Sequence, residues 1–116
     1  MAQATEGLGG GARSEVDVRQ LRDEVVGRVQ FHPEPRFLGV LAALEWALGD
    51  RESAPVTGPA GPPSSGGDLV HEEQHAHRVG EHPRLSGMAP EYADAVKRTL
   101  LWLEGKTEER PLVSED

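Results

Sequence analysis

One short run of this sequence carries residues that could perform chemistry together. The pattern H-E-x-x-H is met by residues 71–75, which read HEEQH. On a helix this spacing places two imidazoles one turn apart, where they can bind zinc, and the glutamate beside them can polarise a zinc-bound water. The motif therefore raises the hypothesis of a minimal zinc-dependent hydrolase, with His71, His75 and Glu91 as metal ligands and Glu72 as the base.

The surroundings of the motif argue against catalysis. A helix that holds catalytic zinc is usually apolar around its ligands, whereas this segment continues with Gln74, His77 and Arg78 and is polar on all sides. The chain has no cysteine, so it offers neither a thiolate ligand nor a thiol nucleophile. We therefore predict no catalytic residues and no cofactor, and keep zinc as an alternative.

The rest of the chain is organised around an apolar stretch at residues 37–48. At helical spacing it has two apolar sides, one of larger and one of smaller side chains. The first side holds Phe37, Leu41, Leu44 and Leu48, and the second holds Gly39, Ala42, Ala43 and Trp46. A helix that is apolar on both sides must be covered on both sides. The small residues of the second side favour close approach of another helix.

The segments around this stretch predict an all-α fold. Residues 14–52 form a helical hairpin, in which Ser14 caps the first helix, Pro33 ends it, and Pro35 begins the central helix. Residues 68–105 hold a short polar helix and a C-terminal amphipathic helix that begins at Pro90. The prediction is a small bundle of three main helices and one short, weak helix. Residues 1–13, the Pro/Gly/Ser linker at 53–67 and the charged tail at 106–116 are expected to be disordered.

The net charge of -8 limits the classes of partner. An acidic surface repels phosphate, so nucleic acid and anionic membranes are not expected partners. No stretch is apolar and long enough to span a bilayer, and residues 1–13 do not resemble an export signal. We expect a cytoplasmic protein.

A small non-enzymatic interaction protein fits these observations best, acting as an adaptor, assembly factor or regulator. The C-terminal helix has more apolar residues than its buried stripe needs, because Leu101 lies opposite that stripe and Trp102 lies at its edge. We predict that Leu101 and Trp102 border a contact with another protein or with a second copy of this chain. The zinc hydrolase remains the first alternative, and an acidic inhibitor that mimics nucleic acid is the second.

Overall fold

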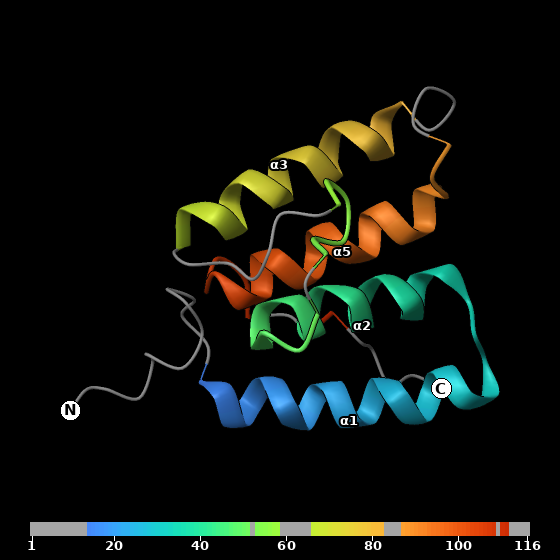
Figure 1. Ribbon diagram of the computed structural model, residues 1–116, viewed down its shortest axis with the longest axis vertical. Helices are drawn as coiled ribbons and strands as arrows, with labels where there is room; N and C mark the ends of the chain where they lie inside the picture. Colours follow the sequence, from blue (N-terminus) through green and yellow to red (C-terminus); the bar gives the residue numbers. More distant parts are fainter. Residues whose placement is uncertain (1–13, 52, 59–65, 83–86, 109, 112–116) are drawn as a thin grey trace.

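The computed structural model describes residues 14–51, 53–58, 66–82, 87–108 and 110–111. These parts of the chain form four helices and no strand (Figure 1). The helices are α1 (Glu15–Phe31), α2 (Pro35–Leu48), α3 (Gly66–Glu81) and α5 (Pro90–Leu103). The predicted all-α bundle is confirmed. Residues 1–13, 59–65 and 112–116, for which disorder was predicted, lie outside the described residues. None of the described helices is long and apolar enough to cross a membrane.

The helix boundaries follow the signals in the sequence. The side chain of Ser14 accepts a hydrogen bond of 3.2 Å from the backbone N–H of Asp17 at the start of α1. Pro35 is the first residue of α2, where its missing N–H leaves no donor unpaired. Gly49 ends α2 with φ 82°, a left-handed conformation that glycine adopts without steric cost. Pro90 begins α5 in the same way as Pro35 begins α2.

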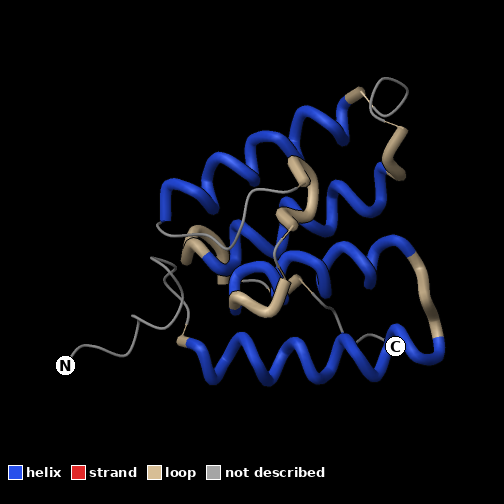
Figure 2. The backbone as a smooth tube through the Cα atoms, in the orientation of Figure 1, coloured by secondary structure: helices blue, strands red, loops and turns tan. Residues whose placement is uncertain are grey.

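The helices lie in a row in which α1 packs on α2, α2 on α5, and α5 on α3 (Figures 1 and 2). The helix α2 is therefore covered by two neighbours, as its two apolar sides predict. Its contact with α5 is close: a Cβ added at Gly39 would lie 2.6 Å from the carbonyl oxygen of Tyr92 and 2.9 Å from the Cβ of Ala95. The small residues of α2 thus permit the close approach of another helix, as predicted.

The two neighbours of α2 bury most of its circumference, but not all of it. Phe37 and Leu44 are buried as predicted, but Leu41 and Leu48 are half-buried, at the border of the covered arc. Val40 and Ala47 are buried in addition. Leu38 is exposed and Glu45 is half-buried, so the side of α2 that neither neighbour covers is a narrow one.

The segment between α2 and α3 differs from the predicted linker. Residues 53–58 form a tight turn closed by two backbone hydrogen bonds between Ala54 and Gly58, and Ala54 is part of the core. The helix α3 is also longer than the short polar helix that was expected, and it is anchored through buried Leu69 and Ala76. The turn and α3 stabilise each other through Glu72, which the sequence reading had assigned only to the zinc hypothesis.

Candidate partner-binding surface

The HEEQH motif lies on α3, but its glutamate faces the protein interior. Glu72 is 2% exposed, and its carboxylate accepts three hydrogen bonds from the turn at residues 53–58. Oε2 accepts from the backbone N–H groups of Val56 and Thr57, the latter at 3.0 Å, and Oε1 accepts from the Thr57 hydroxyl at 2.6 Å. Both oxygens are therefore occupied in holding the turn. A carboxylate bound in this way is not placed to polarise a water beside the histidines.

The proposed zinc ligands are not brought together with that base. His71 is exposed and His75 is half-buried, with their rings edge to face and their centroids 4.6 Å apart. Glu91 is exposed in the first turn of α5. Within the described parts of the chain, no three His, Asp or Glu side chains are grouped so that they could hold a metal ion. Helical spacing explains the position of Glu72, which shares a face of α3 with the buried Leu69 and Ala76.

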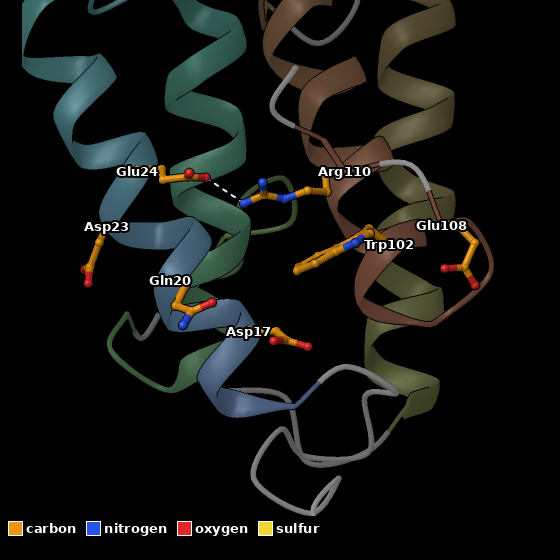
Figure 3. A pocket seen from close by; sticks show the side chains of 7 residues that line it. All are labelled: Asp17, Gln20, Asp23, Glu24, Trp102, Glu108 and Arg110. Atoms are coloured by element: carbon orange, nitrogen blue, oxygen red, sulfur yellow. Dashed lines mark hydrogen bonds and ion pairs between the residues drawn. The ribbon is translucent and has the colours of Figure 1, made fainter. Parts of the chain in front are cut away.

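A larger feature lies at the other end of the helix row. An open hollow of about 680 Å³ separates α1 from the C-terminal end of α5 and the segment that follows it (Figure 3). Its lining is mostly polar and charged. The lining residues are Asp17, Gln20, Asp23, Glu24, Trp102, Glu108 and Arg110. The first four come from α1, so the hollow joins the N-terminal helix to a segment almost ninety positions later in the chain.

The charges around the hollow are mainly negative. Arg110 spans it and pairs with Glu24, with 2.6 Å between Arg110 Nη2 and Glu24 Oε1 (Figure 3). Asp17 points into the space, whereas Asp23 points away and pairs with Arg22 at 3.1 Å. No ion pair joins the carboxylate of Asp17 to another residue in the described segments. The hollow therefore presents unpaired negative charge beside an existing guanidinium–carboxylate pair.

Exposed apolar side chains lie at both ends of the same side of α1. Val16 is 65% exposed and Phe31 is 78% exposed, and they are two of the three exposed large hydrophobic residues among those described. Counting along the helix, Val16, Gln20, Glu24, Gly27 and Phe31 form one stripe at successive helical turns. We call this stripe, together with the hollow, the α1 surface. The two apolar side chains lie beyond the two ends of the hollow, and neither lines it.

The two residues predicted to border a partner contact have different environments. Trp102, expected at the edge of the buried stripe of α5, is 5% exposed and forms the inner wall of the hollow. It belongs to the hydrophobic core, and α1 lies across the hollow from it (Figure 3). Leu101 is half-buried and lines a smaller hollow of about 170 Å³, which Arg110 also borders. Arg110 thus borders both hollows, the one lined by Trp102 and the one lined by Leu101. The role of Leu101 and Trp102 in binding stays a prediction.

A buried carboxylate lies just after Trp102, at the end of α5. The Glu104 side chain is 5% exposed, and Lys106 Nζ lies 3.0 Å from its Oε1 and 3.9 Å from Oε1 of Glu73. Burial raises the pKa of Glu104 above its ordinary value, Lys106 opposes this increase, and the charge of Glu73 adds to it. The same carboxylate raises the pKa of Lys106. Because the pKa of Glu104 is raised on folding, its protonation is coupled to the free energy of unfolding.

No family model, no curated protein and no solved structure matches this chain. The α1 surface was not found from the sequence. Val16 and Phe31 lie outside the apolar stripe that predicts the buried side of α1. Arg110 lies in a segment that was expected to be a disordered tail. Placed together, a guanidinium-accepting hollow and two apolar side chains can bind a segment of another protein that carries both basic and apolar groups.

Proposed function

We propose that this protein is a non-enzymatic interaction module, an adaptor, assembly factor or regulator, that binds another protein through the α1 surface. The observation that carries the proposal is the combination of the hollow with exposed Val16 and Phe31 along one side of one helix. Ligand sites for small molecules are mostly apolar and bury most of their ligand. The hollow is open and lined mainly by charged groups, which supports a protein segment as the occupant.

A different protein is a better candidate for this partner than a second copy. Two copies would each carry a net charge of -8 and would repel each other unless their contacts were sharply complementary. The environment of Glu72 supports the non-enzymatic proposal over the zinc hydrolase, because the carboxylate that would act as the base is bonded to the turn at residues 53–58.

Site-specific photo-cross-linking in the native host cells tests the proposal. The photoreactive residue benzoylphenylalanine replaces Val16 in one variant and Phe31 in another, both positions being exposed. The matched control carries it at Gln74, which is exposed on α3 at the opposite end of the helix row. We expect the two α1 variants to form an adduct of the same mass, and the Gln74 variant to form none.

The adducts distinguish the possible outcomes. An adduct at the mass of two chains would identify the partner as a second copy. Adducts of equal yield at Val16, Phe31 and Gln74 would show that the α1 surface has no preference for a partner, and the proposal would be wrong. Loss of the adduct after Gln20→Arg, which places a long cation beside the hollow, would localise the contact further.

A further inference from the structure

We propose that the hollow receives an arginine side chain from a basic segment of the partner, and that an apolar residue of the same segment packs on Phe31. This inference rests on the proposed function and adds the chemistry of the partner. It is carried by three features of the α1 surface: the charge balance of the hollow, the guanidinium already bound in it, and the distance from the hollow to Phe31.

The charge balance of the hollow favours a cation. Four carboxylates line it, against one guanidinium, and that guanidinium is already paired. Arg22 neutralises Asp23 on the outer side of α1, which leaves Asp17 pointing into the hollow and Glu108 at its border (Figure 3). A cation that enters such a space gains attraction from several carboxylates at once, and at Glu24 it competes with Arg110.

Arg110 shows that the hollow can hold a guanidinium. Its side chain reaches from the segment after α5 to Glu24 on α1, and half of its surface is exposed. A guanidinium is planar and can pair with carboxylates through several N–H groups, whereas the ammonium of lysine is a compact, strongly hydrated charge. The ring of Trp102 forms the inner wall beside this pair, and its 5% exposure leaves the contacts of an incoming arginine mainly to the carboxylates. These features favour arginine over lysine.

Phe31 defines the second contact and the spacing of the partner. It lies eleven positions after Gln20 on the same side of α1, which corresponds to roughly 16 Å at the helical rise per residue. An extended chain covers about 3.3 Å per residue, so the apolar residue should lie about five positions from the arginine. Charge alone would not specify a partner, whereas this spacing does.

Synthetic peptides test the inference with the whole protein. The probe is an acetylated, amidated eight-residue peptide of glycine and serine with one arginine and, five positions later, one leucine. Two control peptides carry citrulline in place of arginine, or leucine directly after the arginine. Binding is followed by nuclear magnetic resonance of the side-chain N–H signals. The signals of Trp102 and Gln20, in the hollow, should shift, and that of Trp46, in the α2 core, should not.

Variants at the two ends of one ion pair give the sharpest test. Glu24→Gln removes an acceptor for the arginine and should raise the Kd of the probe about two- to fivefold, the range for one exposed ion pair. Arg110→Gln removes the competing guanidinium and should lower the Kd by about the same factor. Both variants break the same contact, so a purely structural role would change the Kd in one direction. Glu91→Gln, an exposed carboxylate at the far end of α5, is the control and should leave the Kd unchanged.

Two results would overturn the inference. The first is equal affinity for the arginine and citrulline peptides, and the second is a change of the Kd in the same direction for Glu24→Gln and Arg110→Gln. If either occurs while the cross-links at Val16 and Phe31 form, the proposed function stands and only the arginine site is wrong. If the peptides bind as expected but no cross-link forms in cells, the guanidinium site stands and the proposed function is wrong.

Discussion

Replacement of Glu72 separates the structural role of this residue from the catalytic one that the HEEQH motif suggests. Its carboxylate accepts hydrogen bonds from Val56, from the backbone of Thr57 and from the Thr57 hydroxyl. In Glu72→Ala these donors lose their acceptor and a buried space is left. In Glu72→Gln the amide oxygen can still accept from the two backbone N–H groups, and the amide N–H₂ can donate to the hydroxyl.

The two variants should differ in the size of their effect. A hydrogen bond to a charged group contributes about 1.5–3 kcal/mol, and a neutral one about 1 kcal/mol. Val56 is half-buried and Thr57 is exposed, so water can reach part of the turn and the three bonds do not add in full. We expect Glu72→Ala to lower the free energy of unfolding by about 3 kcal/mol and Glu72→Gln to lower it by about 1 kcal/mol.

Urea unfolding followed by far-ultraviolet circular dichroism measures both changes. With a denaturant slope of about 1.5 kcal/mol/M, a loss of 3 kcal/mol moves the midpoint by about 2 M. Gln74→Ala is the matched control, since Gln74 is exposed two positions further along α3, and it should change the free energy of unfolding by less than about 0.5 kcal/mol. His71→Ala combined with His75→Ala should also leave the free energy of unfolding nearly unchanged, because neither ring anchors the turn.

The zinc hypothesis requires the opposite result. A catalytic base can be changed to glutamine with little loss of stability and complete loss of activity. If Glu72→Ala were as stable as Gln74→Ala, Glu72 would not hold the turn at residues 53–58, and its carboxylate would be available to a bound water. One tightly bound zinc per chain that is lost in the double histidine variant would support the same conclusion.

Three further predictions concern packing, ionisation and association. Gly39→Ala should lower the free energy of unfolding by roughly 1–3 kcal/mol, because its Cβ would meet a backbone carbonyl of α5. Gly27→Ala, whose Cβ would meet nothing within 4 Å, should raise that free energy by about 0.5–1 kcal/mol in the same urea assay. The pKa of Glu104 is raised on folding, so the free energy of unfolding should fall as the pH rises from 4.5 through the raised pKa. Glu104→Gln should lack this fall. Parallel plots of the free energy of unfolding against pH for the two proteins would contradict the prediction. Leu101→Glu should keep the helix content, because Leu101 is half-buried, and should weaken the cross-link at Phe31; an unchanged yield would place Leu101 outside the contact.

The fold could be predicted from the sequence where local signals and hydrophobic periodicity agree. Ser14, Pro35 and Gly49 act through backbone geometry and hydrogen bonds within a few residues, so their effect does not depend on the rest of the chain. The two apolar sides of α2 correctly predicted two neighbours. The angle between those neighbours could not be read, because it depends on how α1 and α5 pack. Leu41 and Leu48 were therefore assigned to the core, although they lie at its border.

The structural role of Glu72 could have been predicted from the helical periodicity of α3. Glu72 lies three positions after Leu69 and four before Ala76, which places it on the buried side of α3. A buried carboxylate needs donors, and the nearest donors are the backbone N–H groups of a turn that was read as an unstructured linker. The HEEQH motif suggests a catalytic role for Glu72, whereas helical periodicity places Glu72 on the buried side of α3, where it has a structural role.

The α1 surface could not be found by reading segments one at a time. Its polar floor belongs to α1, its inner wall is Trp102 of α5, and its far edge is Arg110, which pairs with Glu24 across 86 positions of sequence. No local pattern predicts the Arg110–Glu24 pair, because exposed arginines and glutamates are common throughout solvated segments. What the sequence does contain is the repeated exposure of apolar residues on the outer side of α1, at Val16 and Phe31. The proposed function uses these two side chains as contacts with the partner, so the cross-links at Val16 and Phe31 test their role directly.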